Sequence, residues 1–217
     1  MYNKILIVSG GSIDDEFALS WMASYVPEYT IVADSGMEFF RRNGKKPNMI
    51  IGDFDSVNAE TLAFFKTQSD IVWKELNPVK DDTDTEFAIY QALALGATEI
   101  TILGGTGTRL DHVLGNISLL GIGLKKQVQI QLVDAHNRIR MLDKPVKLSR
   151  TEQFGRYVSL IPYNEAVKHL SLKGFKYPLI DFTLEPFNSL GISNEIVEDV
   201  AEITFEEGIL LVIESRD

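Results

Sequence analysis

Two carboxylates, Asp53 and Asp55, follow directly on the short apolar run at residues 49–51, with only Gly52 between the run and the first of them. An apolar run of this length is typical of a buried strand. Carboxylates spaced as D-x-D behind such a strand have two interpretations. They are turn residues, because Asp favours turns through hydrogen bonds to nearby backbone groups, or they bind a hard cation such as Mg²⁺, which prefers oxygen ligands. The pair alone leaves both interpretations open.

More acids follow other apolar runs in the first two-thirds of the chain. Asp34 follows the run at 30–33, and Asp111 follows the run at 99–103. The run at 71–76 is followed by Asp81, Asp82 and Asp84. Open parallel sheets bind ligands beyond the carboxyl ends of their strands. Seven like charges at that edge would repel one another, which favours a site that holds divalent cations. The stretch 83–86 also has a purely structural interpretation, because Thr83 and Glu86 match a capping box and acids in a first helical turn suit the helix dipole.

A glycine-rich turn, Gly105-Thr106-Gly107, stands between the last of these runs and a helical stretch. Glycines let backbone N–H groups approach phosphate oxygens, and a helix N-terminus favours an anion. The turn is not a dinucleotide fingerprint, because Leu110 occupies the position of the third glycine, and the sequence has no G-x-x-x-x-G-K-[ST] motif. Arg109 either clamps a phosphate or forms a surface ion pair. His112 and Asn116 are four residues apart and therefore share a helix face.

A parallel sheet would bring these residues together. Apolar runs rich in Ile and Val predict strands at 4–8, 30–33, 49–51, 71–76 and 99–103, and the stretches between and after them predict helices at 14–26, 37–43, 58–66, 83–95 and 109–126. This alternation indicates βαβ units, with a parallel sheet that is covered by helices. The segment 128–142 alternates apolar and polar residues and predicts one or two further strands.

The pattern changes near residues 143–147, beyond which no long helical pattern occurs. Strands are expected at 156–163, 167–174, 200–205 and 209–216, and Glu206-Glu207-Gly208 predicts a hairpin turn between the last two. We therefore predict an α/β domain with a Rossmann-like parallel sheet and flanking helices over residues 1–144. A small all-β domain is expected over residues 145–217.

The composition limits the function classes. The chain has 217 residues, no cysteine and a formal net charge of −10, with a sequence pI of about 4.8. This charge argues against a nucleic-acid partner, whereas phosphate compounds can be bound when divalent metal ions stand between carboxylate and phosphate. The first apolar run is only four residues long and is interpreted as a strand and not as a signal peptide. No run approaches the roughly 18 residues that a membrane span needs. Together with the absence of cysteine, this predicts a cytoplasmic protein without a membrane partner.

Four motifs, in this order and at these spacings, resemble those of the bacterial thiamine pyrophosphokinase family: ADSG (33–36), GDFDS (52–56), KDDTDTE (80–86) and GGTGTRLDH (104–112). Three more are similar to motifs of that family's second domain: SLIPY (159–163), LKGFKYPL (172–179) and SNE (193–195). The resemblance covers nearly the whole chain. It implies a Mg²⁺-dependent transfer of the pyrophosphoryl group of ATP to the hydroxyl of thiamine, which gives thiamine diphosphate and AMP.

The resemblance also implies roles for particular residues. The expected metal ligands are Asp53, Asp55 and Asp84. Further catalytic acids, as alternative ligands or as groups that orient water and the hydroxyl, are Asp81 and Asp111. The phosphate oxygens are expected to contact Lys80 and Arg109. Other nucleotide contacts are expected from Thr83, Gly105, Thr106, His112 and Asn116, and the same pocket is expected to be lined by Gly10, Gly11, Asp34 and Ser35.

Thiamine is a cation with aromatic rings, so an electron-rich side chain and polar anchors suit it. By resemblance these are Tyr177, Ser193 and Asn194 of the β domain. From the residues alone, the preferred interpretation of Tyr177 is a core aromatic of a strand. In this family the site lies between subunits, so the resemblance implies a homodimer.

Two other functions fit part of the pattern. A metal-dependent glycosyltransferase also places D-x-D behind a strand, but the additional acidic and R-x-D-H motifs argue against it. A non-catalytic sensor of thiamine or a nucleotide is the second alternative. Such a sensor should lack part of the acidic set, which is complete in this sequence.

Overall fold

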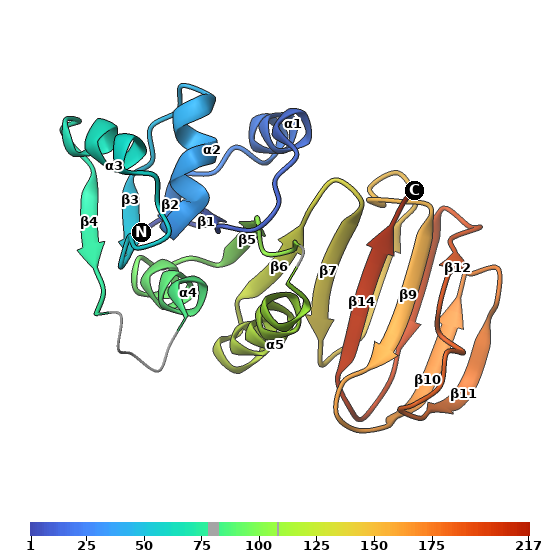
Figure 1. Cartoon of the computed structure of the whole chain (residues 1–217). Helices are drawn as coiled ribbons and strands as arrows, with labels where there is room; N and C mark the ends of the chain where they lie inside the picture. Colours follow the sequence, from blue (N-terminus) through green and yellow to red (C-terminus); the bar gives the residue numbers. More distant parts are fainter. Residues whose placement is uncertain (78–82, 108) are drawn as a thin grey trace. The chain divides into compact units, whose positions relative to one another are not determined.

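The computed structural model describes residues 1–77, 83–107 and 109–217. The chain divides into two compact units, Met1–Ala135 and His136–Asp217, each of which has its own set of elements (Figure 1). The predicted boundary stood at 144/145, so the structure assigns the segment 136–144 to the second unit and not to the first. The physical reason is pairing, because β7 (Asn137–Leu142) runs antiparallel to β14 (Leu210–Ser215) along its whole length.

The first unit is built on a parallel sheet. Its strands lie in the order β4-β3-β2-β1-β5-β6, and every neighbouring pair is parallel. Their bounds are β1 (Lys4–Val8), β2 (Tyr29–Ala33), β3 (Met49–Gly52), β4 (Val72–Glu75), β5 (Glu99–Leu103) and β6 (Gln129–Val133). Residues 5–8 of the central strand are fully buried, as expected for a strand covered on both faces.

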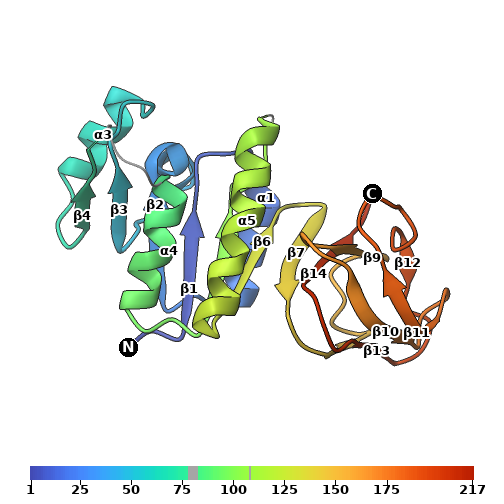
Figure 2. The same cartoon turned by 90° about the horizontal axis from the view of Figure 1, so that it is seen from below.

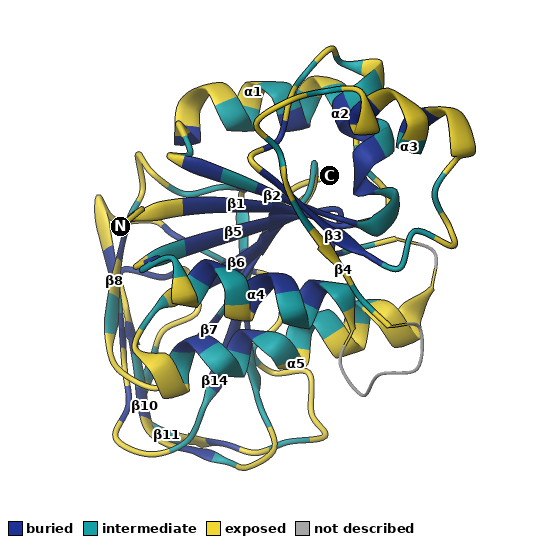
Figure 3. Cartoon of the chain, turned by 90° about the vertical axis from the view of Figure 1, so that its left-hand side faces the viewer, coloured by how far each residue is buried: buried dark blue, intermediate teal, exposed yellow. Residues whose placement is uncertain are grey.

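Helices cover both faces of this sheet. In Figure 3, α1 (Asp15–Tyr25), α2 (Met37–Arg42) and α3 (Ala59–Lys66) lie over one face, and α4 (Asp84–Ala94) and α5 (Leu110–Lys126) lie over the other. A short 3₁₀ turn, Asp34–Gly36, leads from β2 into α2. All five helices agree with the predicted ones to within two residues at each end. Within the described residues, no helix has both the length and the apolar character to cross a membrane.

The order of the strands creates a switch point between β1 and β5. The chain adds β2, β3 and β4 on one side of β1 and then returns to add β5 and β6 on the other. In such sheets the loops behind the carboxyl ends of the strands diverge at the switch point and leave a crevice there. The fold therefore fixes the place where the predicted acids and glycines must meet.

The second unit consists of two antiparallel sheets with a common core (Figure 2). One sheet has the order β12-β9-β14-β7 and the other β11-β10-β13-β8. The bounds not yet given are β8 (Val146–Ser149), β9 (Tyr157–Pro162), β10 (Val167–Lys173), β11 (Leu179–Leu184), β12 (Asn194–Glu195) and β13 (Val200–Thr204). The predicted class, an α/β domain followed by a small all-β domain, is confirmed.

The hairpin predicted at Glu206-Glu207-Gly208 is wrong. β13 pairs with β10 and β8, whereas β14 pairs with β7 and β9, so the two strands belong to different sheets. Both strands bury alternate side chains in the shared core, with Ile203 on β13 and Val212 on β14. The connection therefore crosses from one sheet to the other, and Glu207 forms an isolated bridge with Lys168.

A buried ion pair network ties β7 to β14. The side chain of Glu214 is only 1% exposed and accepts hydrogen bonds from Arg138 at 2.6 and 2.8 Å and from Arg140 at 2.8 Å. The Phe154 N–H donates to the same carboxylate at 3.1 Å. Burial alone would raise the pKa of Glu214, but its hydrogen bonds and the two arginines outweigh burial and hold the pKa below its usual value.

Candidate functional site

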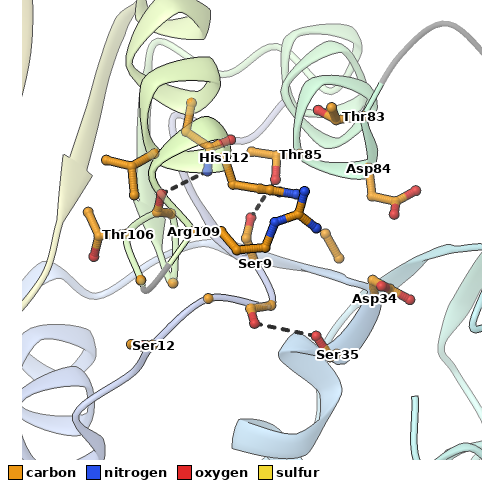
Figure 4. Close-up of a pocket in the computed structure, with 18 of the residues that line it drawn as sticks. Ser9, Ser12, Asp34, Ser35, Thr83, Asp84, Thr85, Thr106, Arg109 and His112 are labelled. Atoms are coloured by element: carbon orange, nitrogen blue, oxygen red, sulfur yellow. Dashed lines mark hydrogen bonds between the residues drawn. The ribbon is translucent and has the colours of Figure 1, made fainter. Parts of the chain in front are cut away.

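A cleft of about 670 Å³ lies beyond the carboxyl ends of the strands, on both sides of the switch point. Side chains from the loops behind β1, β2, β3 and β5 and from the starts of α4 and α5 converge on it (Figure 4). A cleft of this size suits a ligand the size of a nucleotide. The predicted site residues that line it are Gly10, Gly11, Asp34, Ser35, Asp55, Thr83, Asp84, Gly105, Thr106, Arg109, His112 and Asn116.

Glycines allow the loops behind β1 and β5 to touch. The Gly11 N–H donates to the Gly104 carbonyl at 2.8 Å, and the Ser12 N–H donates to the Thr106 carbonyl at 2.9 Å. A Cβ atom on Gly11 would stand 2.2 Å from the Thr106 carbonyl oxygen. The loop behind β2 is equally close, because a Cβ on Gly10 would stand 2.1 Å from Ser35 Oγ. A side chain at Gly11 would therefore push the two loops apart, whereas a side chain at Gly10 would require the Ser35 hydroxyl to rotate away.

Three carboxylates gather beside the cleft, of which Asp34 and Asp55 line it and Asp53 does not. Asp34, Asp53 and Asp55 each offer an oxygen, and these oxygens all lie within 4.8 Å of one another. Asp53 and Asp55 come from the loop behind β3, and Asp34 comes from the 3₁₀ turn behind β2. The sequence predicted that acids from neighbouring strands meet here. It favoured Asp84 as the third metal ligand, whereas the geometric group contains Asp34.

Asp34 is the most constrained of the three. It has a positive φ of 50°, and its Oδ2 accepts a hydrogen bond from the Ser56 hydroxyl. Its Oδ1 is buried and has no hydrogen-bond partner in the described part of the chain. Burial raises the pKa of Asp34, the Ser56 hydrogen bond opposes this, and the charges of Asp84, Asp53 and Asp55 raise the pKa further.

Asp55 is also affected by its acidic neighbours. Its pKa is raised, first by a hydrogen bond with the Asp53 side chain and then by the like charge of Asp53, with smaller effects of burial and of Asp84. An unpartnered buried carboxylate oxygen next to two more carboxylates is unfavourable without a cation. An all-oxygen donor set of this kind fits a hard divalent ion such as Mg²⁺.

Thr83 and Asp84 stand at the start of α4 and also line the cleft. Thr83 is the N-cap, and its hydroxyl accepts the Glu86 N–H at 3.2 Å, so the predicted cap forms. Asp84 is the first residue of the helix and lines the cleft. Its charge is close enough to raise the pKa values of Asp34 and Asp55. The segment 83–86 therefore caps the helix, as its structural interpretation predicts, and also places an acid at the cleft.

The glycine-rich loop and the start of α5 form the remaining wall. Asn116 donates its side-chain amide to the Gly105 carbonyl at 2.7 Å, and the Thr106 hydroxyl donates to Asp134 at 2.9 Å. Arg109 is the N-cap residue of α5 and makes a two-point ion pair with Asp111 at 2.6 and 3.2 Å. Both side chains of that pair are more than 60% exposed, so the pair contributes little stability and the guanidinium can exchange partners.

Some cleft residues were not predicted from the sequence. Ser9 and Thr85 are both buried and share a hydrogen bond of 2.9 Å at the floor of the cleft, between β1 and α4. Ser12 and Ser56 also line the cleft. Their positions directly behind a strand, or within GDFDS, were the available signal, but serine is too common in turns to stand out. The predicted site residues Lys80 and Asp81 lie outside the described residues.

The three residues predicted to bind thiamine lie together in the second unit. Asn194 is buried, and its side chain accepts the Tyr177 N–H at 3.0 Å and donates to the Tyr177 carbonyl at 2.8 Å. The Ser193 N–H donates to Ser159 Oγ at 3.0 Å. The Tyr177 side chain is 59% exposed, with Lys176 Nζ 5.5 Å from the ring centre. Tyr177 is thus no core aromatic, and Asn194 holds its backbone in place.

Comparisons with known proteins match both units. Residues 24–132 match the family model of the thiamin pyrophosphokinase catalytic domain, and residues 145–210 match that of the thiamin pyrophosphokinase vitamin B1 binding domain. The thiamine pyrophosphokinase of Bacillus subtilis is 34% identical over 98% of this chain and 99% of its own.

Solved structures agree with these matches. A crystal structure of the Bacillus subtilis thiamine pyrophosphokinase superposes with a TM-score of 0.89 at 35% identity, over 99% of this chain and 100% of the other. For the thiamin pyrophosphokinase of Geobacillus thermodenitrificans the TM-score is 0.85 at 32% identity, over 99% and 98% of the two chains.

Proposed function

The chain belongs to the thiamine pyrophosphokinase family, and from this premise we propose that the cleft beyond β1 and β5 binds ATP and that Asp34, Asp53 and Asp55 hold its metal ion. The family's reaction moves the pyrophosphoryl group of ATP to the hydroxyl of thiamine. The observation that carries the proposal is the group of three carboxylates within 4.8 Å, beside glycine-rich loops at the switch point. Asp84 lines the same cleft and its charge affects Asp34 and Asp55, so we assign it the role of holding metal-bound water or acting as a further ligand.

In this reaction the hydroxyl oxygen of thiamine forms a bond to the β-phosphorus of ATP. The bond from that phosphorus to the oxygen bridging to the α-phosphate breaks, AMP leaves with the electron pair, and the hydroxyl proton passes to solvent or to a nearby carboxylate. Such transfers depend on positioning and on neutralising charge, with little covalent help from the protein. A bound Mg²⁺ supplies positive charge to the phosphate oxygens.

The chain's own groups supply the rest of the positioning. Arg109 would leave Asp111 to contact phosphate oxygens, because a guanidinium matches phosphate as well as it matches a carboxylate. Gly10 and Gly105 line the cleft without a side chain, so phosphate oxygens can approach the backbone there. The N–H groups of Gly11 and Ser12 are used to hold the two loops together. Thr106, His112 and Asn116 complete the proposed nucleotide contacts, and Lys80 and Asp81 remain predictions.

We propose that Tyr177, Ser193 and Asn194 contact thiamine, as the resemblance implies. A homodimer is proposed on the same ground. The second unit leaves large apolar side chains at its surface, among them Ile180 at 88% and Phe187 at 103% exposed, which an interface between subunits would bury. Cytoplasmic location stays a prediction from the sequence.

Product analysis tests the reaction. The purified protein, given thiamine, ATP and Mg²⁺, is expected to form thiamine diphosphate and AMP in equal amounts, and EDTA should stop both. Formation of ADP in place of AMP would contradict pyrophosphoryl transfer. Thiamine binding without any product would instead support a sensor. The oligomeric state is measured separately by analytical ultracentrifugation, where a monomer at assay concentration would refute the dimer.

A further inference from the structure

The loop that carries Asp53 and Asp55 runs from β3 to the start of α3, and its far end is held by an acid on another helix. We propose that this acid, Glu38 on α2, is a positioning residue that fixes the loop so that both carboxylates face Asp34. This inference rests on the proposed role of the three acids in metal binding. Glu38 lies in none of the four motifs of the first domain.

Both carboxylate oxygens of Glu38 are engaged. Oε1 accepts the Asn58 N–H at 3.1 Å, and Oε2 accepts the Thr61 hydroxyl at 2.7 Å. Thr61 is fully buried and in turn accepts a hydrogen bond from Arg41 at 2.9 Å. Because the Thr61 hydroxyl accepts from Arg41, its single proton is directed to Glu38. The contact therefore has a fixed direction, and this partly buried network holds the start of α3 in place.

These contacts amount to a capping box divided between two helices. Asn58 is the N-cap of α3, and its side chain accepts the Glu60 N–H at 2.8 Å. In an ordinary capping box, a Glu or Gln at the third helical position accepts the N–H of the N-cap residue. In α3 that position is Thr61, so the carboxylate comes from α2 instead. The start of α3 is thereby fastened to α2, which lies beside it on the same face of the sheet (Figures 1 and 3).

The third acid of the group lies just before the N-terminus of α2. Asp34 begins the 3₁₀ turn that leads into α2, and its Oδ2 is bound by Ser56 of the acidic loop. The loop is thus attached to one continuous segment at two places, through Ser56 to Asp34 and through Asn58 to Glu38. Three like charges this close repel one another. The attachment at Glu38 opposes that repulsion and keeps the group assembled before a metal ion arrives.

Metal binding by the whole chain tests the inference with a readout other than turnover. Mn²⁺ is titrated into metal-free protein, and the free ion is measured by electron paramagnetic resonance. Glu38→Ala is expected to raise the Kd for Mn²⁺ by at least about tenfold, the usual effect of losing a group that supports metal ligands. Glu38→Gln should show a smaller rise of about threefold, because its amide oxygen can still accept the Asn58 N–H while its N–H₂ group cannot accept the Thr61 hydroxyl. The control is Glu16→Ala, an exposed acid in the first turn of α1 and outside this network, which should leave the Kd for Mn²⁺ unchanged.

Kinetics separate positioning from general damage. In Glu38→Ala the Mg²⁺ concentration for half-maximal rate should rise in the same proportion as the Kd, while the rate at saturating Mg²⁺ stays within about threefold of the wild type. A Kd for Mn²⁺ within twofold of the wild type in Glu38→Ala would overturn the inference.

Two further variants remove ambiguity. Asp53→Asn should lose Mn²⁺ binding whatever the role of Glu38, so a normal Kd in that variant would contradict the proposed metal site itself. If Glu38→Ala does not fold, Thr61→Val tests the inference instead. This substitution removes the hydroxyl that donates to Glu38 and leaves the side-chain volume almost unchanged. A raised Kd for Mn²⁺ is then expected, and an unchanged Kd would refute the positioning role.

Discussion

Replacing Asp34 with Asn should stabilise the protein when metal is absent and leave it less stable than the wild type when metal is in excess. Asp34 has a φ of 50°, a left-handed conformation that Asn also tolerates. The amide oxygen of Asn can still accept the hydrogen bond from Ser56. The substitution therefore removes one negative charge with little change to the backbone.

The size of the effect follows from the spacing of the acids. Oxygens of Asp34 and Asp53 lie within 4.8 Å, a distance at which two unit charges repel by about 1 kcal/mol even in bulk water. In EDTA, Asp34→Asn should therefore raise the free energy of unfolding by about 1 kcal/mol, or the Tm by roughly 2–4 °C. A ligand at 100 times its Kd stabilises the folded state by about 2.7 kcal/mol. Most of that gain should be lost in the variant, which reverses the order of stability.

The pH dependence has a defined sign. Because the pKa of Asp34 is raised in the folded protein, its charge destabilises the fold at neutral pH, and this penalty fades as pH falls and the folded state takes up the proton. The advantage of Asp34→Asn in EDTA should thus be largest near pH 7.5 and shrink toward the usual carboxyl pKa.

Differential scanning calorimetry in EDTA and in excess Mn²⁺ measures both effects. A variant that is less stable than the wild type in EDTA would mean that the Asp34 carboxylate is satisfied in the fold. Equal Mn²⁺-induced shifts in Tm for the two proteins would mean that Asp34 is not a metal ligand. Either result would refute the reasoning.

Three further predictions concern the frame of the site and the second unit. Glu214→Gln should lower the free energy of unfolding by about 3–5 kcal/mol, because it leaves two half-buried arginines poorly paired. In urea unfolding, the difference from the wild type should be full above pH 4.5 and should disappear as pH falls through the lowered pKa of Glu214. Gly11→Ala should lower the free energy of unfolding by about 1–3 kcal/mol and raise the KM for ATP, because its Cβ would stand 2.2 Å from a backbone oxygen. Gly115→Ala, whose Cβ would have no atom within 4 Å, should be neutral or stabilising. Equal KM values for ATP in the two variants would contradict the role of the Gly11 contact. Asn194→Ala should raise the KM for thiamine about tenfold, because it releases the backbone of Tyr177, and should leave the KM for ATP unchanged. Steady-state kinetics with each substrate varied in turn measures both constants. A change in both KM values would argue against the assignment of Asn194 to thiamine binding.

The parallel sheet was predictable because its signal is local. Strands such as β1 and β5 are nearly continuous apolar runs, and the helices between them have the expected length. The edge at which acids and glycines would meet then follows from topology alone. The sequence therefore indicated the edge of the sheet at which the candidate site lies.

The second unit was harder to predict because its strands are short or irregular. β11 contains Asp181 at a positive φ, and its register with β10 shifts twice, which breaks the two-residue alternation. β12 has only two residues. The failed hairpin at 206–208 has another cause, because a turn sequence predicts a change of direction but not which sheet the next strand joins.

Within the site, the sequence could not decide which acids stand closest together. The third member of the carboxylate group is Asp34, whose side chain is directed by a positive φ and by Ser56, and neither is visible in a motif. The role proposed for Glu38 likewise depends on helix packing. Residue types and spacing thus predicted a metal-binding group of acids. The positioning proposed for that group depends on the packing of α2 against α3.

The most direct test of the account is the rate of AMP formation by Asp53→Asn, measured with thiamine, ATP and saturating Mg²⁺. The proposed metal site predicts a loss of at least about 100-fold, since a metal ion supplies several kcal/mol of charge stabilisation, with unchanged circular dichroism. Asp143→Asn, an exposed acid of the second unit, should retain the wild-type rate. A wild-type rate in Asp53→Asn would contradict the central claim that the carboxylate group at the switch point is the metal site of the reaction.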